Sequence, residues 1–328
     1  MVNDPIRGDV VSDDVVAWLE EQALTSTHLS VSWQPRRRTH VEAKDYFPAY
    51  DDLFARVGNR FATRALHHTA LSRRVVEAYR RGELLEVTNA LVDRYGFGWV
   101  SEDVGLWPIG AKPPSGAGPR LNQEGLWAAV RHARVVRAAL EVPLLIDFPG
   151  FANNAGAHEG PIHAYDFFRV IAEDADVAAT FDVAKFLSYQ WQRRRRGPEM
   201  FAEMEKLPLS RCFEIHVSGR DAMSGRSFEG PADLLFDAQL EMVERLIPLC
   251  PNVRVVAYDG LLFEARAGLA AATMSGFARL RQVIAAWPAK ASASRLEVRV
   301  EVTSSSGELS AGRGSSDARG HRRGHKPA

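Results

Sequence analysis

The stretch SRCFEIHVSGRD, residues 210–221, combines the two features on which the interpretation of the whole chain depends. Its apolar side chains and the glycine that follows them predict a buried strand that ends in a turn. Two titratable side chains, Glu214 and His216, lie near the end of that strand. Two interpretations of His216 are open: a core histidine bonded to a backbone carbonyl, or a residue that faces a functional site.

Other short segments, apolar and rich in β-branched residues, also predict strands. They are HLSVSWQ (28–34), THVEAKD (39–45), FATRALHH (61–68), FGWVSEDVG (97–105), VPLLIDF (142–148), VAATFDVAKF (177–186) and NVRVVAYDG (252–260). Segments with the 3.6-residue apolar spacing of a helix lie between most of them. Strands that alternate with helices pair in parallel through right-handed crossovers. Eight such units predict a closed α/β fold, a (β/α)8 TIM barrel, because closure leaves no edge strand.

The pattern also predicts the domain organisation. A barrel over 28–288 accounts for a single domain, since α/β barrels of about 250 residues commonly form one. The segment SDDVVAWLEEQAL (12–24) predicts a helix within an N-terminal extension, 1–27. Residues 289–328 are rich in Gly, Ser and Arg, so we expect a disordered C-terminal tail.

Composition limits the partners and the compartment. The chain carries 41 basic and 41 acidic residues, so no overall field favours nucleic acid. The runs PRRR (35–38) and RRRR (193–196) are expected to be solvated turns rather than sites for nucleic acid or an acidic leader peptide. No apolar run approaches the roughly 20 residues of a membrane helix, and no secretory signal is evident. The two cysteines, Cys212 and Cys250, lie in apolar settings that suit a reducing compartment. We therefore expect a cytoplasmic protein.

Titratable residues occupy the carboxyl ends of seven of the eight predicted strands, and in such a barrel these ends meet at one mouth. They are Lys44, Asp45, His67, His68, Glu102, Asp103, Asp147, Asp182, Lys185, His216 and Asp259. Imidazoles together with carboxylates suit iron, manganese or zinc, and also general acid and base catalysis. Several aspartates in one mouth repel one another unless a cation compensates them. The pattern therefore favours a metal site over an ion-paired mouth without metal.

Six motifs in order carry a resemblance to a known family over about residues 28–265. They are ALHHTALS, GWVSEDVGLW, PLLIDFPGF, TFDVAKF, CFEIHVSGR and VVAYDG. This series resembles the MbnB/TglH/ChrH family of multinuclear non-heme iron-dependent oxidases. The resemblance implies a xylose-isomerase-like TIM barrel that uses iron and dioxygen to modify a ribosomally synthesised peptide. It also implies a partner protein that recognises the leader peptide.

The resemblance implies ligands residue by residue. His67, Asp182 and His216 match family ligands, and Asp147 stands where the family has a glutamate. Four positions depart from the family pattern: Asp103, Lys185 and Arg220 replace histidines, and Ala257 replaces a glutamate. These departures imply one or two metal ions, iron or another divalent metal, rather than three. The implied ligands are His67, Asp103, Asp147, Asp182 and His216.

The remaining site residues receive roles in the same scheme. Lys185 and Asp259 are the expected catalytic residues, and Lys44, Asp45 and Arg220 are expected to bind substrate. The leading hypothesis is a divergent iron oxidase in natural-product biosynthesis. Two alternatives stay open: a single-metal isomerase or hydrolase that uses Lys185 as acid or base, and a metal-free barrel that binds a peptide or protein.

Overall fold

The computed structural model describes residues 17, 21, 26–33, 42–57, 60–68, 78–103, 121–148, 160–218, 232–259 and 271–286. The chain divides into two compact units, 1–286 and 287–328, and the second lies outside the described residues together with the predicted tail. Within the predicted N-terminal helix, the two described residues, 17 and 21, are both helical.

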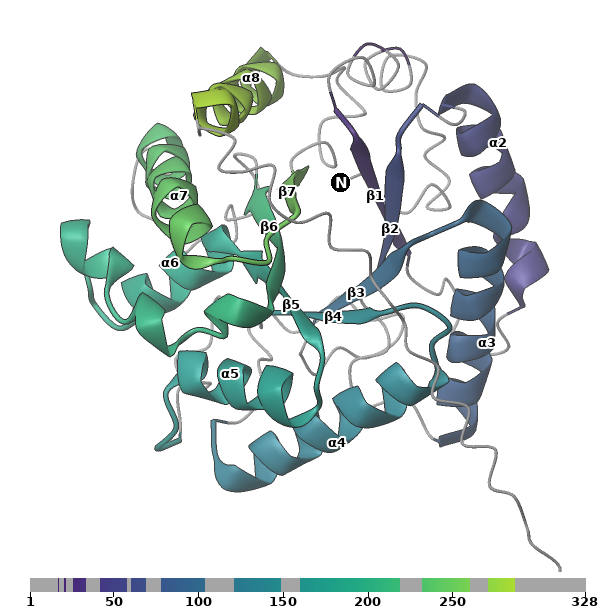
Figure 1. Ribbon diagram of the computed structural model, residues 1–328, viewed down its shortest axis with the longest axis horizontal. Helices are drawn as coiled ribbons and strands as arrows, with labels where there is room; N and C mark the ends of the chain where they lie inside the picture. The colour runs from purple at the N-terminus through teal and green to yellow at the C-terminus, as the bar shows by residue number, and fades with distance from the viewer. Residues whose placement is uncertain are drawn as a thin grey trace, which may run out of the picture. The chain divides into compact units, whose positions relative to one another are not determined.

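The first unit is built around one parallel sheet whose strands follow one another in chain order (Figure 1). The described strands are β1 (His28–Trp33), β2 (Thr63–His68), β3 (Trp99–Asp103), β4 (Leu144–Asp147), β5 (Ala178–Asp182), β6 (Cys212–Ser218) and β7 (Val255–Asp259). They curve into a nearly closed barrel, which confirms the predicted α/β barrel fold.

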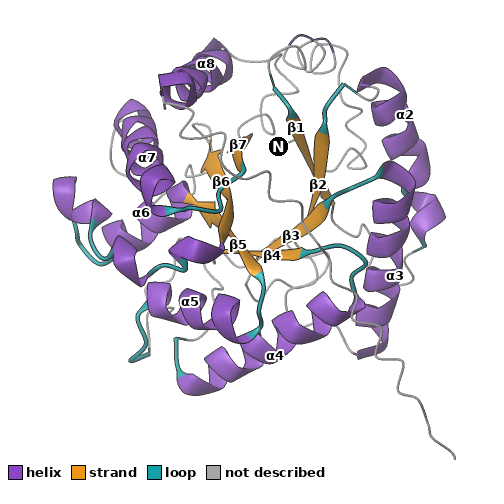
Figure 2. Cartoon of the chain, in the orientation of Figure 1, coloured by secondary structure: helices purple, strands orange, loops and turns teal. Residues whose placement is uncertain are grey.

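Helices surround the strands, as Figure 2 shows. They are α2 (Phe47–Val57), α3 (Ala78–Tyr95), α4 (Gln123–Ala139), α5 (Ala164–Asp174), α6 (Val183–Gln192), α7 (Ala232–Leu246) and α8 (Ala271–Ala286). Short 3-10 helices are η1 (Ala43–Asp45), η2 (Gly197–Phe201), η3 (Met204–Lys206), η4 (Leu209–Arg211) and η5 (Ile247–Leu249). Among the described helices, none has the length and apolar composition that crossing a membrane requires.

The predicted strand at 39–45 is wrong over its described part, because Ala43–Asp45 form η1. Two physical reasons explain the difference. Ala, Lys and Asp are poor strand formers. In addition, β1 pairs directly with β2, with His28 opposite Thr63, so the sheet has no place for a strand between them.

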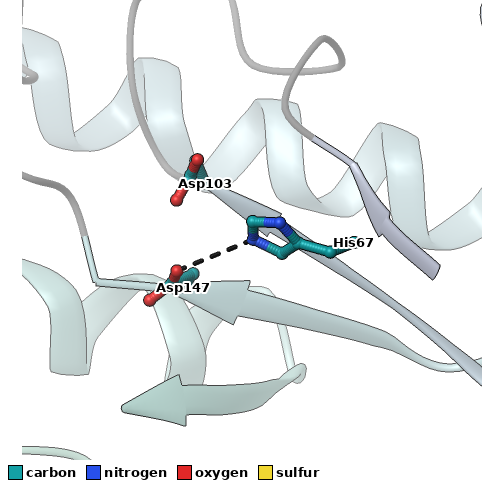
Figure 3. Close-up of side chains that lie close together, drawn as sticks. All are labelled: His67, Asp103 and Asp147. Carbon is teal, nitrogen blue, oxygen red and sulfur yellow. Dashed lines mark ion pairs between the residues drawn. The ribbon is translucent and has the colours of Figure 1, made fainter. Parts of the chain in front are cut away.

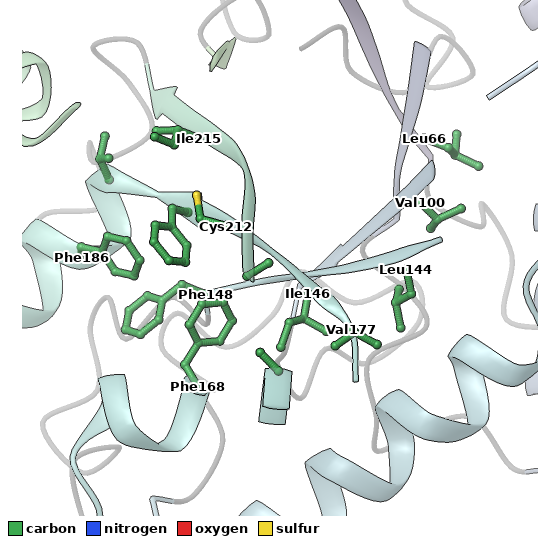
Figure 4. Close-up of a cluster of buried hydrophobic side chains, with 14 of the residues drawn as sticks. Leu66, Val100, Leu144, Ile146, Phe148, Phe168, Val177, Phe186, Cys212 and Ile215 are labelled. Atoms are coloured by element: carbon green, nitrogen blue, oxygen red, sulfur yellow. The ribbon is translucent and has the colours of Figure 1, made fainter. Parts of the chain in front are cut away.

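Alternation along the strands separates two cores. Outward side chains such as Leu66, Val100 and Ile146 pack against the helices in the main core (Figure 4). A smaller cluster groups Ala65, Trp99, Leu145, Val255 and Ala257, which alternate with those outward positions and so lie inside the barrel. The inward positions nearest the carboxyl ends of β2 to β6 are polar, and they form the candidate site.

Both cysteines are buried, as the apolar residues around them in the sequence predict. Cys212 on β6 and Cys250 after η5 are free thiols. Cys212 belongs to the main core between the strands and the helices.

Candidate metal centre

Four neighbouring strands each place one buried polar side chain at or near the carboxyl end, and the first turn of α6 adds a lysine. The group, called the mouth cluster from here on, consists of His67, Asp103, Asp147, Asp182 and Lys185. The parallel register explains the gathering, because Asp103 on β3 lies directly opposite Asp147 on β4. Apart from Asp182 and Lys185, the side chains come from segments far apart in sequence, and the parallel pairing of β2 to β5 brings them together.

Three members of the mouth cluster point toward one another (Figure 3). His67, Asp103 and Asp147 each offer one ligand atom, and these three atoms lie within 4.8 Å of one another. His67 Nε2 is 3.8 Å from Asp147 Oδ2. Among the described residues, His67 Nε2 and Asp147 Oδ1 are buried without a hydrogen-bond partner. A buried polar atom in that state costs about 1–3 kcal/mol, so the two atoms are suited to a ligand.

One imidazole nitrogen and two carboxylates match the ligand preference of divalent iron, manganese or zinc. The donor atoms present therefore fit a single ion. A second ion would need another set of converging donors, and the described part of the chain offers no other such set.

The ammonium of Lys185 lies among the same carboxylates. Its Nζ is 2.6 Å from Asp103 Oδ1, 2.6 Å from Asp147 Oδ2 and 3.5 Å from Asp182 Oδ2. The start of α6 fixes this geometry, because Asp182 is the N-cap and its Oδ1 accepts the backbone N–H of Lys185 at 3.1 Å. Asp182 is thus both a capping residue and part of the acidic site.

Charge is unevenly compensated in the mouth cluster. Burial would lower the pKa of Lys185, but the neighbouring carboxylates hold that pKa well above its ordinary value. Burial would raise the pKa of Asp103, yet the neighbouring Lys185 ammonium and the His67 ring hold it below the ordinary value. For Asp182, burial together with the charge of Asp147 raises the pKa to about 6 despite Lys185. A single lysine does not neutralise three aspartates.

A second polar group, the inner cluster, lies inside the same barrel and consists of Glu214, His28, Trp99 and His216. The indole Nε1–H of Trp99 donates to Glu214 Oε2 at 3.0 Å. His216 Nε2 and His28 Nε2 lie 3.0 and 3.6 Å from Glu214 Oε1. The ring of His28 stacks on Trp99 at 4.9 Å between centroids. Each of these three partners is a donor or a potential cation, yet among the described residues Glu214 Oε1 and His28 Nε2 are buried without a hydrogen bond.

The inner cluster shifts the pKa values of its own members. Burial would raise the pKa of Glu214, but His216, His28 and the Trp99 N–H outweigh it and lower this pKa to about 2. Burial lowers the pKa of His28 to about 4, which favours the neutral ring.

The structure brings together part of the predicted ligand set. His67, Asp103 and Asp147 converge, and Asp182 lies beside them through Lys185. His216 directs Nε2 toward Glu214, and its ring lies 5.8 Å from the ring of His67, in an edge-to-face contact. His216 thus connects the inner cluster to the mouth cluster.

Other predicted site residues lie away from the mouth cluster or outside the described residues. Lys44 and Asp45 are exposed on η1, where Lys44 pairs with Glu42. Asp259 is the last residue of β7, and nothing is described of its side chain. Arg220 falls outside the described residues. A functional role for Lys44, Asp45, Arg220 and Asp259 stays a prediction.

Two further sequence features have structural partners. Glu102 faces outward, where His132 of α4 lies 3.2 Å away. In the arginine run, Arg193 and Arg195 both pair with Glu203. Arg196 covers the ring of Trp191 at 3.3 Å from its centroid. These three arginines therefore have partners within the chain.

The sequence interpretation missed the inner cluster, although one signal pointed to it. Glu214 and His216 are two residues apart on one strand, so both side chains face the same side of the sheet. No comparable signal linked Glu214 to His28 and Trp99, which reach it from two other strands.

Comparisons with known proteins return structural likenesses only. The sequence matches no family model. No curated protein matches it either. A crystal structure of the IolI protein with a bound zinc atom is similar over 87% of this chain and 96% of that one, with 14% identity and a TM-score of 0.49.

Two further solved structures show the same degree of likeness. Endonuclease IV from Thermus thermophilus is similar over 87% of this chain and 97% of that one, with 12% identity and a TM-score of 0.47. A sugar phosphate isomerase/epimerase from Parabacteroides distasonis is similar over 88% of this chain and 93% of that one, with 15% identity and a TM-score of 0.47. Likeness this weak does not carry a function from those proteins to this chain.

Proposed function

We propose that the protein is a metal-dependent barrel enzyme that binds one divalent ion through His67, Asp103 and Asp147. The observation that carries the proposal is the convergence of three buried ligand atoms within 4.8 Å at the carboxyl ends of β2, β3 and β4. Catalytic sites of α/β barrels lie at this end of the strands. The hydrogen-bonding capacity left over at His67 Nε2 and Asp147 Oδ1 supports a cationic ligand.

The finer part of the proposal is an iron- and dioxygen-dependent oxidation of a ribosomally synthesised peptide, with a leader-binding partner protein. It rests on the six-motif resemblance, and the donor set of one imidazole and two carboxylates is compatible with iron. When bound, such an ion supplies Lewis acid and redox chemistry.

The chain's own residues provide proton and charge control beside that ion. Lys185 is held in its ammonium form, so it can donate hydrogen bonds to an anionic group of the substrate. Asp182, with its pKa raised to about 6, can hold or release a proton near neutral pH. These two groups border the carboxylates that would hold the ion.

Metal binding of anaerobically purified protein tests the proposal. Saturation with Fe(II) should give about one tightly held ion per chain by elemental analysis after desalting, since one donor set is present. His67→Ala and Asp147→Asn should lose it. His132→Ala is the matched control, because His132 also lies beside a buried carboxylate, Glu102, yet outside the barrel interior.

Two outcomes would redirect the proposal. Retention of the ion by both His67→Ala and Asp147→Asn would remove the proposed ligands. Preference for zinc or manganese over iron in a competition experiment would favour the single-metal isomerase or hydrolase, with Lys185 as acid or base.

A further inference from the structure

We infer that Lys185 is an internal competitor of the metal: its ammonium occupies the place of the ion between Asp103 and Asp147, and metal loads only when this side chain moves away. The inference rests on the proposed metal site, and it concerns how that site is regulated.

The first step is that the ammonium and the ion share their partners. Lys185 Nζ lies 2.6 Å from Asp103 Oδ1 and 2.6 Å from Asp147 Oδ2. Asp147 Oδ2 is also the oxygen that faces His67 Nε2. Two of the three proposed ligands are therefore already bound to a cation in this state of the chain.

The second step is that both cations cannot occupy the site together. A divalent ion binds a carboxylate oxygen at about 2.0–2.2 Å. Held by the same two oxygens, the ion and the ammonium would be close neighbours in a buried setting, where like charges repel strongly. Binding of one therefore requires displacement of the other.

The third step is that a divalent ion compensates the charge of the mouth cluster better than the ammonium does. Asp103, Asp147 and Asp182 all lie within 3.5 Å of the one ammonium, so three carboxylates share a single positive charge. A divalent ion would compensate more of their negative charge. The exchange is thus electrostatically favourable once the metal concentration is high enough.

The fourth step is that Lys185 has a way out. It lies in the first turn of α6, and 24% of its side chain is exposed, whereas Asp147 is 1% exposed. The four-carbon stem can turn outward while the backbone stays capped by Asp182 Oδ1. Displacement of the ammonium therefore needs no unfolding of the barrel.

The test compares Mn(II) affinity in the wild type and in Lys185→Met, which keeps the length of the side chain and removes its charge. We expect the variant to bind Mn(II) on the order of 10- to 100-fold more tightly by titration calorimetry, the usual size of coupling between two sites. Lys206→Met is the matched control, because Lys206 also pairs with a carboxylate, Glu203, at 2.8 Å, away from the mouth cluster. Its affinity should equal that of the wild type.

A second readout separates competition from a general packing effect. Without metal, Lys185→Met should melt at a lower temperature than the wild type, because the aspartates lose their cation. Saturating Mn(II) should restore more stability to the variant than to the wild type. Lys185→Gln, which keeps a hydrogen-bond donor, replaces Lys185→Met if the latter does not fold.

The outcomes distinguish the two proposals. Equal Mn(II) affinity in the wild type and the uncharged variants overturns the competition and leaves the metal site standing. Failure of all variants to bind Mn(II), Fe(II) or Zn(II) overturns the metal site and the competition with it.

Discussion

The mouth cluster and the inner cluster are two buried polar groups inside one barrel, and they differ in how many partners each carboxylate has. In the inner cluster a single carboxylate, Glu214, has three partners: Trp99, His216 and His28. In the mouth cluster three aspartates share one ammonium. Buried charge costs stability unless it is paired and hydrogen-bonded. We therefore expect the first group to stabilise the barrel through the Trp99 N–H and the nearby imidazoles, although Glu214 Oε1 itself forms no hydrogen bond among the described residues, and we expect the second to hold charge available for a ligand.

Opposite pKa shifts follow from this difference. Both Glu214 and Asp182 are buried, and burial alone raises the pKa of each. The partners of Glu214 reverse the effect and lower its pKa to about 2, whereas the pKa of Asp182 remains raised, to about 6. The number and kind of partners, rather than depth, decide the direction.

Removing the central group of the inner cluster should produce the largest effect. Glu214→Ala leaves the Trp99 N–H without its acceptor and the nearby histidines without their carboxylate. We expect a loss of about 3–5 kcal/mol in the free energy of unfolding, measured with urea and followed by circular dichroism. Glu214→Gln keeps an acceptor for Trp99 and should lose less. A loss below about 1 kcal/mol in Glu214→Ala would show that the inner cluster is not a stabilising group.

The next effect is a pH dependence that His28 gives to the inner cluster. Its folded-state pKa of about 4 lies below the ordinary 6.5, so the neutral ring is favoured in the folded state. The free energy of unfolding is therefore undiminished by His28 above pH 6.5, and it falls by up to about 3 kcal/mol as pH falls from 6.5 toward about 4. His28→Phe keeps the stacking on Trp99 and cannot take up a proton. Its free energy of unfolding should therefore fall less than that of the wild type between pH 7 and pH 4.5, and equal slopes would contradict the assignment.

Much of the fold could be predicted from the sequence because alternation and helical spacing are local signals. The strand ends at Asp103, Asp147 and Asp182 were identified as parts of one mouth for the same reason. The strand predicted at 39–45 failed because a short polar segment between two strands has no periodicity of its own. The sequence of one segment does not show which strands will be neighbours in the sheet. Here β1 pairs directly with β2, which leaves no position for a strand at 39–45.

Local sequence patterns could not predict how the side chains are arranged within the site. Lys185 was expected near the mouth, but its position between two carboxylates depends on the capping of α6 by Asp182. In the sequence, Lys185 is 82 residues away from Asp103 and 38 residues away from Asp147. Contacts of this kind follow from barrel closure and from side-chain conformation, which residue spacing does not encode.

The smallest expected effect has the opposite sign and comes from the mouth cluster. Asp182 has a folded-state pKa of about 6, above its ordinary 3.8, so its contribution to stability is present below pH 3.8 and is lost as pH rises through 6. Asp182→Asn removes this penalty and keeps an N-cap for α6, since asparagine caps as well as aspartate. We expect the variant to be about 1–2 kcal/mol more stable than the wild type at pH 8, with the difference vanishing near pH 4.

Asp166→Asn is the control for this last comparison, because Asp166 is a partly exposed carboxylate paired with Arg169 on α5. Its stability should change by no more than a few tenths of a kcal/mol at either pH. Urea unfolding of both variants at pH 8 and pH 4 provides the measurement. A loss of stability in Asp182→Asn at pH 8 would mean that Lys185 compensates the three aspartates fully, and the contrast between the mouth cluster and the inner cluster would then disappear. A gain confined to high pH would instead show that the mouth cluster holds uncompensated negative charge, as expected of a site that accepts a second, stronger cation.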